Sequence, residues 1–147
     1  MSITAASMSQ LLTLTQERNF YQMQQIYWSN EHTAMTAKVK QHEKYQATWN
    51  NAYDKIANPA STDDNGKVKV NGKEYTAGDL GAAEEYAYSV CEEYNEETLL
   101  ELSNLEVEYE SMQQMYETLL EETNARIEQQ KELVSENAKD TGLLNAG

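Results

Sequence analysis

Residues 14–56 read LTQERNFYQMQQIYWSNEHTAMTAKVKQHEKYQATWNNAYDKI, and every seventh residue of this stretch belongs to one ladder. The ladder is apolar except for one histidine, and its members are Leu14, Tyr21, Trp28, Met35, His42, Trp49 and Ile56. A heptad repeat keeps one stripe of a helix facing a partner helix along its length. The ladder therefore predicts a long helix that packs side by side with another.

The second half of the chain carries a stricter heptad pattern, which we call the seam. The spacing between its successive apolar residues alternates between three and four positions. Its members are Leu102, Leu105, Tyr109, Met112, Tyr116 and Leu119. We therefore expect an N-terminal long helix over 1–57, which ends before Pro59, and a C-terminal long helix over 80–138. Gly142 is expected to interrupt the tail, 139–147, whose Leu143 and Leu144 are available to dock on a partner.

Residues 58–81 differ from both flanks, because they hold the one proline and four of the six glycines. Within them, KVKV and KEYT flank Asn71-Gly72, the strongest short signal for a β-hairpin. We assign 58–79 to a loop and hairpin insert that turns the chain around. The predicted fold is mainly α, a long antiparallel, coiled-coil-like helical hairpin with this insert between its helices. The insert is expected to be exposed at Val68, Val70, Asn71, Gly72 and Tyr75.

Ten Tyr, two Trp and six Met carry much of the apolar surface, and such rings suit half-hydrated helix interfaces. We predict the intersubunit interface from these residues and the two seams: Leu14, Phe20, Tyr21, Tyr27, Trp28, Met35, Trp49, Leu102, Leu105, Tyr109, Met112, Tyr116 and Leu119. The rings at 20, 21, 27 and 28 cover more than one helix face. They either pack within the chain or form a second contact surface.

Charge divides the chain unevenly within a net charge of −14. Residues 1–78 hold eight Lys/Arg and seven Asp/Glu, whereas residues 79–147 hold three and eighteen. The acidic half is either a solvated face that favours solubility or a surface for pairing with the lysine-bearing helix of a neighbour. Nucleic acid is not an expected partner, because phosphate binding requires a basic stripe.

No set of residues predicts catalysis, and we expect no enzyme activity, no cofactor and no metal. His32 and His42 lack the Glu three positions earlier that di-metal helical bundles use, and phosphate loops and nucleophile elbows are missing. Cys91 reads as a small buried hydrophobe. No stretch is long and apolar enough to span a membrane. Residues 1–16 lack a basic segment, so no cleavable secretory signal is predicted.

The start Met1-Ser2-Ile3-Thr4-Ala5-Ala6-Ser7, the heptad-bearing helices at both ends and the small β insert together resemble the axial proteins of flagellar and type III secretion systems. In that family the terminal helices pair and stack into a hollow tube, and the insert faces outward. The resemblance implies that 4–57 and 80–138 polymerise and that 63–78 are exposed. It also implies export without a cleaved signal, with an export chaperone as a further partner.

The leading hypothesis is a non-enzymatic structural protein that self-assembles, as the subunit of a helical filament at the cell surface or outside the cell. One alternative is an acidic coiled-coil adaptor or secretion chaperone in the cytoplasm, which predicts a discrete dimer. Another is a structural component of a phage virion or tail. The sequence does not separate these three.

Overall fold

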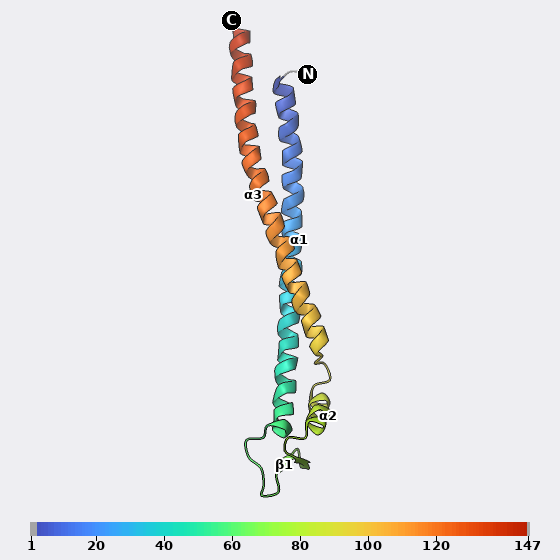
Figure 1. The fold of residues 1–147 in the computed structure, drawn as a ribbon. Helices are drawn as coiled ribbons and strands as arrows, with labels where there is room; N and C mark the ends of the chain where they lie inside the picture. Colours follow the sequence, from blue (N-terminus) through green and yellow to red (C-terminus); the bar gives the residue numbers. More distant parts are fainter. Residues whose placement is uncertain (1–2, 147) are drawn as a thin grey trace. The chain divides into compact units, whose positions relative to one another are not determined.

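A computed structural model describes the backbone of residues 3–146 and the side chains of residues 5–139. The order of elements is α1 (Ile3–Ala57), β1 (Lys67–Val70), β2 (Lys73–Thr76), α2 (Leu80–Val90) and α3 (Glu96–Ala146) (Figure 1). The chain is therefore mainly helical, with a two-stranded antiparallel sheet between helices. This part of the predicted fold is confirmed.

The expected single helix over 80–138 is wrong, because the chain leaves helical geometry between α2 and α3. Asp79 caps the start of α2 by accepting a hydrogen bond from the Ala82 amide. Asn95 does the same for α3, with its Oδ1 3.0 Å from the Thr98 nitrogen. Asn favours such a cap over a helix interior, because its side chain competes for nearby backbone groups.

The expected end of the C-terminal helix also differs. α3 continues to Ala146, so Gly142 lies inside a helix and does not interrupt it. The side chains of Leu143 and Leu144 lie outside the described residues, and their docking on a partner stays a prediction.

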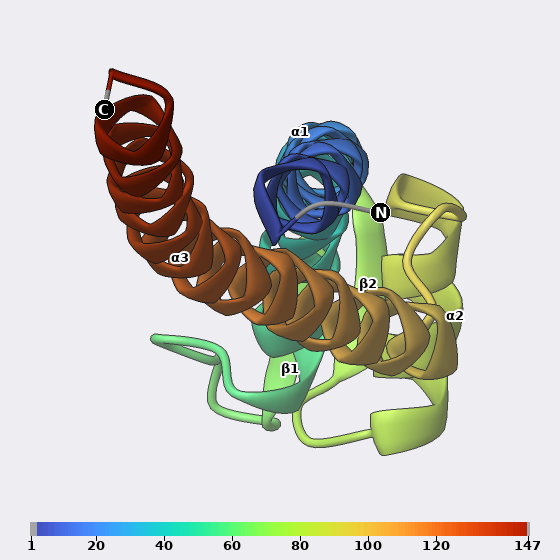
Figure 2. The ribbon, with the colours of Figure 1, turned by 90° about the horizontal axis from the view of Figure 1, so that it is seen from above.

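The chain forms two compact units, and α1 runs through both. The first contains the residues up to Thr33 and from Val107 onward, and the second is Ala34–Glu106. In the first unit, contacts between α1 and α3 occur in opposite sequence order. Gln130 bonds to Ser7, Tyr116 lies against Phe20 and Tyr109 lies against Trp28. These two segments therefore run in opposite directions, and Figure 2 views the same two helices from above.

The core of the second unit joins the hairpin to the helices on either side of it. Ile56 of α1, Val70 of β1 and Ala83 of α2 are buried together. β1 and β2 pair in the expected register around Asn71 and Gly72, whose φ angles of 51° and 77° give the turn that a two-residue hairpin needs. A two-stranded sheet is marginal by itself, so it is stabilised by packing one face on the helices.

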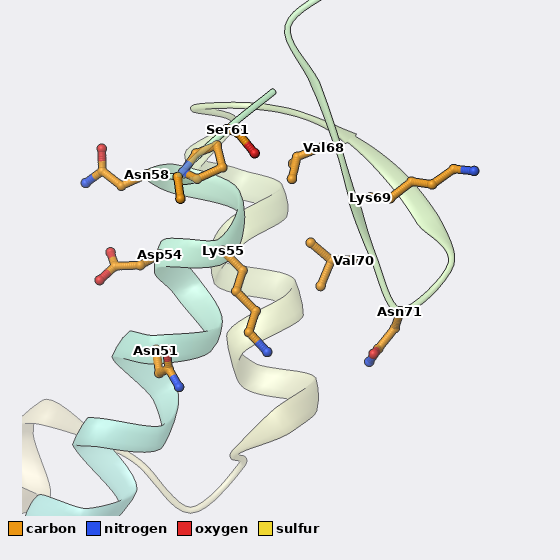
Figure 3. Close-up of a pocket in the computed structure, with 11 residues that line it drawn as sticks. Asn51, Asp54, Lys55, Asn58, Ser61, Val68, Lys69, Val70 and Asn71 are labelled. Carbon is orange, nitrogen blue, oxygen red and sulfur yellow. The ribbon is translucent and has the colours of Figure 1, made fainter. Parts of the chain in front are cut away.

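This packing corrects the expectation that the whole insert is exposed. Asn71 and Gly72 are exposed, but Val68 and Tyr75 are half-buried and Val70 is 7% exposed. Successive residues of a strand point to opposite faces. In Figure 3, Val68 and Val70 lie on the side of β1 that faces α1, whereas Lys69 points away.

Candidate functional site

The N-terminal half of the ladder packs against α3 of its own chain. The rings of Tyr21 and Tyr116 lie 6.2 Å apart, and those of Trp28 and Tyr109 lie 5.4 Å apart. Leu14, Tyr21 and Trp28 are all half-buried. Part of the surface of these three predicted interface residues is therefore already covered within the first unit.

The predicted seam of α3 is half-buried at all six positions, 102, 105, 109, 112, 116 and 119. The seam then continues through three buried residues that the sequence did not indicate: Thr123, Ile127 and Gln130. Thr123 and Gln130 are polar. From Leu119 onward these positions follow at steps of four, four and three residues, which break the alternation of three and four and add to an interval of 11. Such an interval shifts the buried stripe around the helix. A search for apolar heptads alone misses it.

Two polar contacts, one buried and one half-buried, lie where α1 and α3 meet in the first unit. Gln130 donates from Nε2 to the backbone oxygen of Ser7 at 2.9 Å, and Asn137 donates from Nδ2 to the Ser7 hydroxyl at 2.8 Å. A shifted pairing would bury these groups without partners, which costs more than the bonds contribute. The contacts therefore favour one register between the helices.

The predicted aromatic cluster is divided between two sides of α1. Tyr21 and Trp28 are half-buried and contact α3. Phe20 and Tyr27 are each 52% exposed, although one edge of the Phe20 ring also meets Tyr116. The first alternative, packing within the chain, holds for Tyr21 and Trp28, whereas a second contact surface at Phe20 and Tyr27 stays a prediction.

Phe20 and Tyr27 belong to an exposed apolar row that we call the outer stripe: Met8, Leu12, Phe20, Met23, Ile26 and Tyr27. Successive members are four, eight, three, three and one residues apart. At about 100° per residue all six fall within about a third of the helix circumference. Each is between 52% and 70% exposed. Scattered exposed apolar residues are common on any protein, whereas apolar side chains that gather along one side of a helix are typical of interaction surfaces.

The surface around the outer stripe is uncharged. Every exposed residue from Ala5 to Ala34 is apolar or neutral, including Gln16 and Asn19, which fill the gap in the stripe. The charged residues of this segment, Glu17, Arg18 and Glu31, are half-buried and lie outside the exposed row. In a chain with a net charge of −14, this is a distinct local environment.

The C-terminal half of the ladder lies inside the second unit. Met35 is 6% exposed and His42 is also 6% exposed, while Trp49 is half-buried. The Trp49 ring stacks on Tyr53 at 5.0 Å and contacts Tyr94 at 5.5 Å. Trp49 therefore packs on rings of its own unit, and Met35 is buried.

A groove of about 510 Å³ runs between the end of α1 and β1 (Figure 3). Asn51, Asp54 and Lys55 line it from α1, and Val68 to Asn71 line it from the hairpin. Its walls mix charged and amide side chains with two valines. It is open to solvent.

The described side chains show no group of three or more His, Cys, Asp and Glu placed to hold a metal ion. Cys91 is 3% exposed, so its burial is confirmed. Among the described residues, no helix combines the length and hydropathy needed to cross a lipid bilayer.

No protein-family model, curated protein or solved structure matches this chain.

Proposed function

We propose that this protein is a non-enzymatic structural subunit that self-assembles through its long amphipathic helices, with a helical filament as the end state. The outer stripe of α1 carries this proposal. Its six side chains are 52% to 70% exposed, mostly on the side of α1 away from Tyr21 and Trp28, and at its edge the Phe20 ring meets Tyr116 of α3 at 6.5 Å.

Charge supports a second copy as the occupant of the stripe. Two chains with a net charge of −14 repel each other, and the repulsion is strongest where acidic faces meet. The exposed residues of α1 around the stripe are uncharged. Two copies that meet along this face bury apolar surface and keep their acidic residues apart.

The size of the stripe is in the range of a real interface. Six large side chains, each exposed over about half of their surface, present on the order of 600 Å². A standard interface buries about 800 Å² on each partner. Flanking residues such as Gln16 and Asn19 would supply the remainder at the rim.

We further propose that α1 and α3 pair as an antiparallel, coiled-coil-like hairpin, so that one face of α1 is used within the subunit and the other between subunits. The half-buried heptad positions on both helices support this arrangement. Signal-independent export and a cell-surface location follow from the resemblance to axial proteins and stay predictions.

Sedimentation velocity and electron microscopy of the pure protein over a concentration series test the proposal. We expect association that grows with concentration, and filaments at the upper end. The test variant is Leu12→Gln/Met23→Gln/Ile26→Gln, since Gln is uncharged and a good helix former. It should stay monomeric with unchanged helix content by circular dichroism.

A matched control changes three exposed apolar residues of α3: Leu100→Gln, Val107→Gln and Leu133→Gln. This variant should assemble like the natural chain. A natural chain that is monomeric at every concentration, or equal loss in both variants, would refute the outer stripe as the contact. A discrete dimer that never extends would favour the adaptor alternative over a filament.

A further inference from the structure

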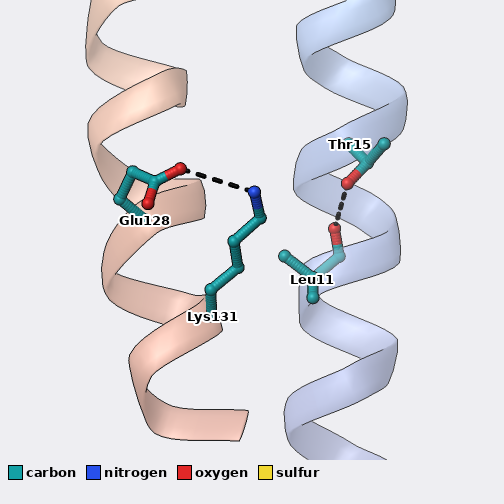
Figure 4. A network of polar contacts seen from close by, with 4 residues as sticks. All are labelled: Leu11, Thr15, Glu128 and Lys131. Carbon is teal, nitrogen blue, oxygen red and sulfur yellow. Dashed lines mark hydrogen bonds and ion pairs between the residues drawn. The ribbon is translucent and has the colours of Figure 1, made fainter. Parts of the chain in front are cut away.

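Most of the basic residues are confined to one part of the chain. Seven of the eleven Lys and Arg lie between residues 38 and 73. On α1, Lys38, Lys40, Lys44 and Lys55 are exposed. Among the described residues the ion pair is Lys131 with Glu128, 3.4 Å apart within α3 (Figure 4). These four lysines therefore make no ion pair within the described chain.

A line of glutamates on α3 has the complementary charge. Glu110, Glu121 and Glu132 are exposed and follow one another at intervals of 11 residues. Eleven residues make slightly more than three turns, so the three carboxylates lie along one side of the helix. The half-buried seam residues Tyr109, Tyr116 and Leu119 lie on a different side.

The lysines share this spacing, because Lys44 and Lys55 are also 11 residues apart. At a rise of about 1.5 Å per residue, both intervals span about 16 Å along a helix. Two helices lying side by side can therefore pair both lysines with two successive glutamates at once.

We propose that the lysine face of α1, defined by Lys44 and Lys55, docks on the glutamate line of α3 in a second copy. The proposal rests on the self-assembly proposed above and adds a second contact to it. Single exposed ion pairs stabilise little, so the spacing matters: it repeats the attraction along one contact. The two surfaces have opposite charge. The lysine faces of two copies repel each other, as do two glutamate lines, whereas a lysine face attracts a glutamate line.

This pairing has a consequence for the form of the assembly. A contact between two different surfaces of the same chain is head-to-tail, and it leaves one free surface at each end of every complex. Such contacts form rings when the rotation closes and open helices when it does not. The charged contact therefore allows further copies to add at each end, as a filament needs. The outer stripe, by contrast, can be fully covered when only two copies associate.

The first test is salt dependence, because exposed charge pairs are screened within about 3 Å at about 1 M salt. We expect long assemblies at about 0.05 M NaCl and short ones at about 1 M, seen by light scattering and electron microscopy. The stripe contact is apolar and should survive high salt as a small oligomer. Assemblies of equal length at both salt concentrations would overturn the proposal.

The second test is charge reversal. Lys44→Glu/Lys55→Glu should raise the critical concentration for elongation at least tenfold at low salt. The control Lys69→Glu/Lys73→Glu makes the same change in net charge at exposed hairpin lysines and should have less than a twofold effect. Equal inhibition by both pairs would assign the effect to net charge and reject the docking site.

The third test restores the pairing with reversed polarity. Lys44→Glu/Lys55→Glu combined with Glu121→Lys and either Glu110→Lys or Glu132→Lys has the natural net charge. At least one of these two variants should elongate again at low salt. If neither elongates while both remain helical, the glutamate line is not the partner surface. Failure of the proposed function has a different sign: the variant Leu12→Gln/Met23→Gln/Ile26→Gln would then assemble like the natural chain. The two failures can therefore be told apart.

Discussion

The Nε2 atom of His42 lies 2.9 Å from the backbone oxygen of Asn95 and 3.1 Å from its backbone nitrogen. His42 is on the ladder of α1, and Asn95 caps the start of α3 through its own side chain. The imidazole is 6% exposed and touches the rings of Tyr45 and Tyr94. The one polar member of the ladder therefore positions the break between α2 and α3.

Replacing His42 should loosen the start of α3. His42→Phe keeps a ring but removes the nitrogen that bonds to Asn95. The Asn95 N–H then lacks a protein partner, although its carbonyl still accepts from the Leu99 amide, so we expect a loss of about 1 kcal/mol of unfolding free energy. Hydrogen exchange should become faster at the amides of residues 95–99. His42→Gln retains a polar group and should recover part of the loss; equal exchange in all three proteins would contradict the role of this contact.

Ile56 should dominate the stability of the second unit, because its side chain is fully buried against Val70 and Ala83. Ile56→Ala should lower the free energy of unfolding by about 2–5 kcal/mol, and Ile56→Val by about 0.5–1.5 kcal/mol. Chemical denaturation monitored by circular dichroism measures both. A loss below 0.5 kcal/mol for the alanine variant, well under the usual range, would show that the hairpin does not pack on α1.

Trp28→Phe should be tolerated although it replaces a large ring. The indole nitrogen of Trp28 is buried and has no hydrogen-bond partner among the described residues. An unbonded buried donor costs about 1–3 kcal/mol, and phenylalanine removes it while keeping contact with Tyr109. We expect an unfolding free energy within about 1 kcal/mol of the natural value, against a larger loss for Trp28→Ala.

Gly72 should be sensitive to substitution for a backbone reason alone. Its φ angle is +77°, and a Cβ added there would meet no atom within 4 Å. Gly72→Ala should therefore cost about 1–2 kcal/mol from the left-handed conformation, without a steric clash. Asn71→Gly is the control, because glycine readily adopts the φ of 51° found there. A thermal melt of both variants distinguishes them.

Much of the architecture could be predicted from local patterns. The heptad ladder from Leu14 to Ile56 lies within one continuous helix, and Asn71-Gly72 forms the expected hairpin turn. Both signals act over a few residues, where backbone geometry leaves few alternatives. The break at Asn95 was missed although Asn followed by Glu96 and Glu97 is a typical helix start.

The candidate site was only partly predictable. The sequence singled out Phe20, Tyr21, Tyr27 and Trp28 as a group but could not divide them. It also missed Met8, Leu12, Met23 and Ile26, which complete the outer stripe. Their spacing of three and four was present in the sequence, overlapping the stronger ladder on the same helix.

The sequence by itself determined the helical character of most of the chain, the hairpin turn and which apolar residues share a side of a helix, because these depend on periodicity and local backbone preference. The tertiary structure alone decided which of these sides is covered. Tyr21 and Trp28 are packed by Tyr116 and Tyr109, about ninety residues away in the chain, and Val70 is buried by Ile56 and Ala83. Periodicity gives the angle between two stripes on one helix, whereas burial depends on which distant segment reaches each of them.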